Sequence, residues 1–173
     1  FQGGKDIPTP NLDALAKRSI RCTSGYVTHP FCSPTRAGLL TGHYQQRFGH
    51  ENNPIWNPDD TKPGLPLTET TLPQVLKTAG YTTACIGKWH LGSNPEYMPT
   101  ARGFDEFFGI PYSIDQGTRP LMRNLDIVEE PANLDTLTQR FTTAAADFIG
   151  RANGNPFFLY MAQARHLDLK ASA

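Results

Sequence analysis

Residues 157–162, Phe157-Phe158-Leu159-Tyr160-Met161-Ala162, form a continuous apolar run that decides the fold class. The turn-forming sequence Asn-Gly-Asn-Pro at residues 153–156 precedes this run directly. A short apolar run bounded by turn residues is typical of a strand that is covered on both faces, as in a parallel sheet. We therefore predict a buried strand over residues 157–162.

A helical pattern precedes this strand, and another helical pattern precedes a second predicted strand at residues 81–87. Leucine and phenylalanine recur at helical spacing over residues 134–149, directly before the turn. The same spacing predicts a helix over residues 72–79, which Gly80 ends, and residues 81–87 follow as a compact strand. Helices that alternate with buried strands indicate a layered α/β domain, with a mostly parallel central sheet flanked by helices.

The rest of the chain is expected to hold shorter elements and two irregular connections. Residues 9–17 are typical of a helix in which Thr9 accepts from the first-turn amides. Residues 21–28 have strand character. Residues 52–66 contain several prolines, and residues 95–116 are rich in glycine, proline and aromatic side chains. Both stretches predict irregular structure.

Composition narrows the class of protein. The chain has 173 residues, of which 38% are hydrophobic and 18% charged, as expected for one folded domain rather than a disordered tail. Sixteen basic and sixteen acidic residues cancel, which removes the electrostatic argument for a nucleic acid or a membrane surface as partner. No run approaches the roughly 18 apolar residues that would span a bilayer.

The chain has three cysteines, Cys22, Cys32 and Cys85. An odd number without C-x-x-C spacing argues against both a disulfide framework and a cysteine metal site. Cys22 and Cys85 lie in apolar, strand-like sequence, so we expect them to be plain buried cysteines. Cys32 differs, because it directly precedes a predicted helix.

Residues 32–42 carry the candidate chemistry. Ser33 is expected to cap a short helix that opens at Pro34 and ends at Gly42. A cysteine before a helix faces free backbone amides and the positive end of the helix dipole, which favour negative charge. Arg36 can return over the same helix end and bind an oxyanion. The pattern favours a nucleophile that attacks a tetrahedral anion.

Two other interpretations of this segment stay open on physical grounds. The first is a buried cysteine beside a helix cap, with Arg36 in a surface ion pair. The second is a cysteine-type phosphatase, which needs an arginine six positions after the cysteine to close its phosphate cradle. Gly38 occupies that position, so the second interpretation is weak.

The same segment resembles the signature of the sulfatase family. In that signature a cysteine, a proline two residues on and an arginine four residues on mark conversion of the cysteine to formylglycine. Cys32, Pro34 and Arg36 fill these positions, and residues 39–42, Leu-Leu-Thr-Gly, match the end of the signature. Thr35 stands where serine is more usual, and both are small hydroxyl residues.

A second block, residues 80–92, resembles the second sulfatase signature. It places Lys88 and His90 at the end of a buried strand, where ligands of open α/β sheets bind. The resemblance also covers residues 9–16, 102–109 and 156–160.

The resemblance implies an alkaline-phosphatase-like fold and a sulfuric ester hydrolase. It implies that a separate formylglycine-generating maturation enzyme oxidises Cys32 and that the aldehyde hydrate is the nucleophile. Arg36 would hold the hydrate, and Lys88 and His90 would contact it and the sulfate. His166 would protonate the leaving-group oxygen or bind the sulfate, as general acid.

The family also binds one divalent cation, usually calcium, through oxygen ligands. Of these ligands the resemblance places only Cys32, as formylglycine, in this chain, with the others expected before residue 1 and after residue 173. Five further aspartates are expected to be turn and loop residues, namely Asp6, Asp59, Asp60, Asp105 and Asp115. We therefore interpret residues 1–173 as a partial N-terminal catalytic domain that has exposed sheet edges and little or no activity alone.

Two functional alternatives remain. One is a phosphonate or phosphate ester hydrolase of the same superfamily that uses the same formylglycine. The other is an inactive relic or binding domain that keeps the signatures. The expected substrate is a sulfated small molecule or carbohydrate, and the family expectation for location is periplasmic or extracellular.

Overall fold

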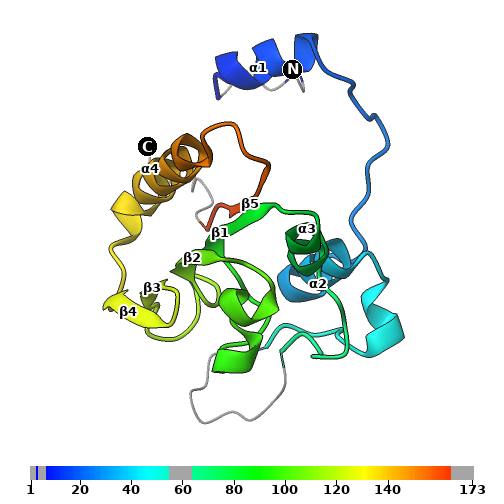
Figure 1. Cartoon of the computed structure of the whole chain (residues 1–173), viewed down its shortest axis with the longest axis vertical. Coiled ribbons are helices and arrows are strands. Elements are labelled where there is room, and N and C mark those ends of the chain that lie inside the picture. Colours follow the sequence, from blue (N-terminus) through cyan, green and yellow to red (C-terminus); the bar gives the residue numbers. More distant parts are fainter. Residues whose placement is uncertain (1–2, 4–6, 55–63, 165–173) are drawn as a thin grey trace.

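The computed structural model describes residue 3, residues 7–54 and residues 64–164. Within them five strands form one sheet in the order β4-β3-β2-β1-β5 (Figure 1). The strands are β1 (Thr82–Lys88), β2 (Glu106–Ile110), β3 (Leu121–Arg123), β4 (Asp126–Glu129) and β5 (Phe157–Ala162). β1 pairs in parallel with both β2 and β5, whereas β3 pairs antiparallel with β2 and β4. The predicted α/β class is confirmed.

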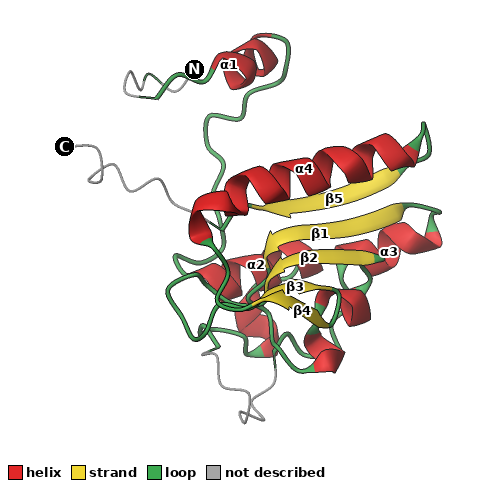
Figure 2. Ribbon diagram, turned by 90° about the vertical axis from the view of Figure 1, so that its left-hand side faces the viewer, coloured by secondary structure: helices red, strands yellow, loops and turns green. Residues whose placement is uncertain are grey.

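Helices lie on both faces of this sheet. They are α2 (Cys32–Thr41), α3 (Leu72–Thr78) and α4 (Leu134–Ala152), with short 3-10 turns η1 (Gln45–Phe48), η2 (Pro95–Tyr97) and η3 (Pro99–Arg102) nearby. A further helix, α1 (Pro10–Lys17), has no buried residue and lies apart from the sheet (Figure 2). Figure 1 shows α4 on one side of the sheet and α2 and α3 on the other. None of the helices in the described part of the chain is long and apolar enough to cross a membrane.

The strand alternation explains this layering. Successive side chains of a strand point to opposite faces of the sheet. Cys85 and Phe107 therefore pack with Leu40 of α2, while their neighbours Ile86 and Phe108 pack on the other face, under α4. Each face has its own apolar cluster, so a two-sided core holds the sheet between its helices.

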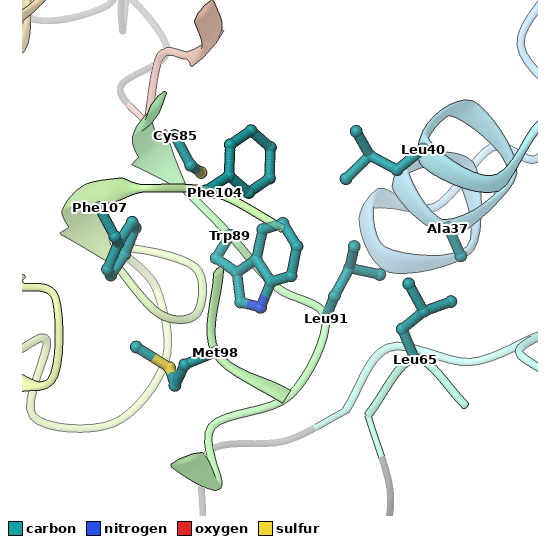
Figure 3. Packing of buried hydrophobic residues seen from close by; sticks show 9 residues of the cluster. All are labelled: Ala37, Leu40, Leu65, Cys85, Trp89, Leu91, Met98, Phe104 and Phe107. Carbon is teal, nitrogen blue, oxygen red and sulfur yellow. The ribbon is translucent and has the colours of Figure 1, made fainter. Parts of the chain in front are cut away.

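The cluster beneath α2 is centred on Trp89 (Figure 3). The Trp89 ring meets the edge of Phe104, with ring centroids 6.0 Å apart. Phe104 stacks in turn on Phe158 and on Tyr160 of β5. This aromatic packing fixes the position of α2 relative to the ends of β1 and β5.

Several predicted elements appear close to their predicted bounds. α1 and α3 match the helices expected over residues 9–17 and 72–79 within one residue at each end. α4 begins at the predicted residue and runs three residues further, and β5 has the predicted bounds.

Other predictions were wrong. β2 lies inside residues 95–116, which were expected to be irregular, because Phe107 and Phe108 are buried by pairing with β1 and by packing on both faces. Residues 21–28 form no strand, and Cys22 is exposed rather than buried, because this stretch has no neighbouring strand. Cys85 is buried, as predicted.

The prediction that β5 is covered on both faces was wrong. Phe157 and Met161 are 37% and 39% exposed. Among the described residues β5 and β4 are the outer strands of the sheet (Figure 2), so β5 has a neighbouring strand on one side only.

Candidate active site

The candidate site lies at the carboxyl end of β1. Lys88, the last residue of the strand, is 6% exposed, and His90 is 1% exposed. The His90 backbone adopts φ 65°, a left-handed conformation that is unusual for a residue other than glycine. Its amide donates to the Pro111 carbonyl at 2.9 Å, just beyond the end of β2. This hydrogen bond therefore joins the turn after β1 to the turn after β2.

Arg36 joins three elements at this edge. From α2 its Nη1 donates to the Lys88 carbonyl at 2.5 Å and to the Tyr160 hydroxyl of β5 at 3.2 Å. Burial raises the pKa of Tyr160, and the nearby Arg36 charge opposes that rise. Tyr160 is therefore a neutral phenol that orients the guanidinium.

Cys32 is the first residue of α2, one turn before Arg36. Its thiol is free and exposed. α2 begins two residues earlier than predicted, and Ser33 is a buried residue of its first turn instead of the cap. The residue before the helix, Phe31, makes no side-chain cap hydrogen bond. The thiol thus lies at the start of a helix, where the helix dipole favours negative charge. The amides of Ser33 and Thr35 are already bonded, to Asn53 Oδ1 and to the Phe31 carbonyl, and Pro34 has no N–H.

His90 is neutral near pH 7. Burial lowers its pKa to about 4, and the positive charge of Lys88 acts in the same direction. Its Nε2 lies 3.1 Å from the Pro54 carbonyl oxygen, which can only accept, so Nε2 carries the proton. Nδ1 then presents a lone pair, and it is buried with no hydrogen-bond partner among the described residues. That atom can accept a hydroxyl proton.

The loop after β2 also contributes, which the sequence analysis missed. Lys88 Nζ donates to the Ser113 hydroxyl at 2.9 Å. A hydrogen bond with Ser113 lowers the pKa of Asp115, and the positive charge of Lys88 acts in the same direction. Asp115 is therefore a loop residue, as predicted, but one whose negative charge faces the site. The sequence offered no signal for these residues, because β2, whose carboxyl end lies beside that of β1, was itself not predicted.

Arg36, Lys88 and His90 are thus brought together, and Cys32 lies one turn from Arg36 on the same helix. The predicted His166 lies outside the described residues, as do Asp6, Asp59 and Asp60. Asp105 accepts from the Thr83 amide near the start of β1, far from the carboxyl end.

The described residues contain no group of three or more histidine, cysteine, aspartate or glutamate side chains that could hold a metal ion. Calcium takes six to eight oxygen ligands. The part of the chain that the structure describes therefore does not fit a complete calcium site.

A cleft of about 620 Å³ lies between the β2–β4 sheet face and α4. Its lining includes Ile86 and Phe108, which belong to the face opposite α2. Two of its arginines form ion pairs, Arg151 with Glu106 at 2.7 Å and Arg140 with Glu129. We place the chemistry at the β1 end, because the nucleophile candidate and the buried histidine lie there.

A layered α/β domain that places a buried lysine and a half-buried arginine near a cysteine at a helix start is typical of proteins that bind tetrahedral anions. The chain belongs to the sulfatase family, whose model, described as Sulfatase, matches residues 1–166. Human arylsulfatase G is 41% identical over 198 residues, which cover 93% of this chain and 37% of that protein. Human N-acetylgalactosamine-6-sulfatase is 40% identical over 188 residues, covering 95% of this chain and 36% of that protein.

Solved structures agree with this assignment. PsFucS1 sulfatase from Pseudoalteromonas sp. has a TM-score of 0.79 at 29% identity, covering 93% of this chain and 39% of that one. BT4656, solved in complex with its substrate D-glucosamine-2-N,6-O-disulfate, has a TM-score of 0.67 at 31% identity, covering 96% of this chain and 31% of that one. The fold is that of the alkaline-phosphatase-like sulfatases, and the chain spans less than half the length of these relatives.

Proposed function

We propose that the protein hydrolyses sulfate esters through a formylglycine made from Cys32. The observation that carries this proposal is the convergence of Arg36, Lys88 and neutral His90 beside the helix that begins at Cys32. Membership of the sulfatase family supports it, since formylglycine and a divalent cation are general to that family.

The chemistry starts with a separate maturation enzyme, which uses an external two-electron oxidant to convert the Cys32 side chain to an aldehyde and releases the sulfur as hydrogen sulfide. The aldehyde adds water to form a geminal diol. One hydroxyl attacks sulfur, the bond from sulfur to the ester oxygen breaks, and the alcohol leaves with a proton. The second hydroxyl then loses its proton, sulfate departs, and the aldehyde is restored. The balance is ester plus water giving alcohol plus sulfate and a proton.

The residues of the site have distinct roles in this proposal. His90 Nδ1 accepts a hydrogen bond from the diol and can take its proton. Arg36 holds the diol, and Lys88 supplies positive charge where the sulfate oxygens gather charge. His166 is proposed as the acid that protonates the leaving oxygen.

For the metal, we propose a calcium ion that contacts the formylglycine at position 32. The other calcium ligands would come from outside the described residues. The roles given to His90, Arg36 and Lys88 do not depend on the calcium ion. We also propose that the protein acts in the periplasm or outside the cell, as expected for the family.

The proposed substrate is a sulfated carbohydrate or small molecule. One relative is named for N-acetylgalactosamine-6-sulfate, and one structural neighbour was solved with a disulfated glucosamine. Both observations support a sulfated carbohydrate as the substrate.

The test uses the complete protein, co-expressed with a formylglycine-generating enzyme. A panel holds an aryl sulfate, 6-sulfated amino sugars, a phosphate monoester and a phosphonate. We expect hydrolysis of the sulfates, abolished by Cys32→Ala and unchanged by Cys22→Ala at an exposed cysteine outside the site. Faster phosphonate or phosphate hydrolysis would favour the alternative hydrolase, and converted but inactive protein would favour a relic.

A further inference from the structure

Residues 50–54, which we name the tether loop, contact the start of α2 next to Cys32 and also contact His90. The Ser33 hydroxyl lies 2.6 Å from His50 Nε2. The Ser33 amide donates to Asn53 Oδ1 at 2.9 Å. At its far end the loop places the Pro54 carbonyl 3.1 Å from His90 Nε2. One five-residue segment therefore binds the residue after Cys32 and also the ring of His90.

These contacts are shielded from solvent. Ser33 is fully buried and His50 is 7% exposed. Burial lowers the pKa of His50, so its ring is neutral near pH 7, and a backbone hydrogen bond with Gly64 opposes that shift only in part. Buried polar groups must find partners, since an unsatisfied one costs about 1–3 kcal/mol. Ser33 and His50 satisfy each other.

Besides the contacts of Ser33, the first turn of α2 is held by the Thr35 hydroxyl, which donates to the His29 carbonyl. Phe31, the residue before the helix, makes no side-chain cap hydrogen bond. The hydroxyl that could have capped the helix, that of Ser33, is directed at His50 instead. Ser33, the residue next to Cys32, is therefore held by the tether loop through both its hydroxyl and its amide.

We propose that His50 and Asn53 are positioning residues for the nucleophile. By fixing Ser33 they set the direction in which residue 32 is presented, while the Pro54 carbonyl fixes the tautomer and the ring of His90. The tether loop thereby sets the relative placement of nucleophile and base. This inference rests on the proposed sulfatase function.

The test compares His50→Leu, which removes the hydrogen bond, with His50→Gln, whose amide can restore it. In the complete, formylglycine-containing protein we expect His50→Leu to lower kcat about tenfold or more, with KM within about threefold, because displaced reacting groups lose rate more than affinity. His50→Gln should recover most of that loss. His43→Leu, at an exposed histidine that contacts Glu69 instead, is the matched control and should change neither value.

Asn53→Ala gives a second route if His50→Leu does not fold. It removes the Ser33 amide contact at a partly exposed side chain and should also lower kcat more than it raises KM. Wild-type kcat in both the Leu and the Ala variants, or a change confined to KM, would overturn the proposal.

Hydrogen exchange separates this proposal from the proposed function. The Ser33 amide should exchange at least about tenfold faster in His50→Leu and Asn53→Ala than in wild type, whether or not the protein turns over a sulfate ester. Absence of turnover in converted wild-type protein would count against the sulfatase proposal alone. An unchanged exchange rate of the Ser33 amide in both variants would overturn the proposal that the tether loop positions Ser33.

Discussion

At the scale of single residues, the two sequence signatures located the site but not the groups that support it. Arg36, Lys88 and His90 could be predicted because short motifs carry them. Tyr160 could not, since it lies 124 residues from Arg36 along the chain and meets it only through folding. Ser113 is likewise joined to Lys88 only where two parallel strands end together. Partners of this kind follow from tertiary packing, which no local pattern encodes.

The buried, neutral His90 predicts acid sensitivity of the fold. Its pKa is about 4 in the folded chain against 6.5 when unperturbed, so the unfolded state binds more protons between these values. Stability is therefore complete above about pH 6.5 and falls as the pH drops towards 4, by about 3 kcal/mol from this residue. Urea unfolding at pH 7 and pH 4.5 measures the effect.

The matched variants are His90→Gln and His43→Gln. The first should show a clearly smaller loss of stability between the two pH values, with a remainder from His50, whose pKa is also lowered by burial. The second, at an exposed position, should keep the wild-type loss. An identical pH dependence in wild type and His90→Gln would contradict this account.

At the scale of elements, the sequence predicted those strands and helices that have strong local patterns. β5 and α4 follow from an apolar run and a helical stripe. β2 was missed because it is short and lies among glycines and prolines, and its strand conformation depends on the register with β1. The start of α2 was misplaced because Ser33 is engaged by a distant loop instead of capping the helix.

Gly87 of β1 is required by the close approach of β5. Its φ is 110°, and a Cβ there would lie 1.9 Å from the Ala162 carbonyl oxygen. We expect Gly87→Ala to cost several kcal/mol of unfolding free energy or to prevent folding, since both backbone strain and a backbone clash result. Denaturant unfolding or, failing expression, the soluble yield measures this.

Gly150 of α4 provides the control, because a Cβ there meets no atom within 4 Å. Gly150→Ala should be neutral or stabilising by up to about 1 kcal/mol, as for glycine within a helix. Equal stability of the two variants would mean that the β1–β5 approach is less tight than described.

At the scale of the whole molecule, the charges balance and apolar side chains remain exposed on the outer strand β5. The net formal charge is +0, so little electrostatic repulsion opposes association. Phe157 and Met161 are more than a third exposed on a strand that has a neighbour on one side only, among the described residues. Such an edge favours pairing with another chain.

The 173-residue chain is therefore expected to self-associate as its concentration rises. Met161→Lys should reduce this association, because a charge on an edge strand opposes pairing with a second strand. Leu12→Lys, at a comparably exposed residue of α1 outside the sheet, should have a smaller effect. Sedimentation velocity over a range of concentrations measures this association. Equal association of the two variants would contradict the claim that the exposed edge of β5 causes it.

The most direct test of the account is peptide mass spectrometry on Cys32 after co-expression with a formylglycine-generating enzyme. Cleavage after Arg21 and Arg36 releases one peptide that also contains Cys22, a cysteine that should stay a thiol. We expect the mass loss of one thiol-to-aldehyde conversion at residue 32, and we expect a hydrazide to trap the aldehyde. A peptide with both thiols intact, beside a known sulfatase that is converted in the same cells, would contradict it.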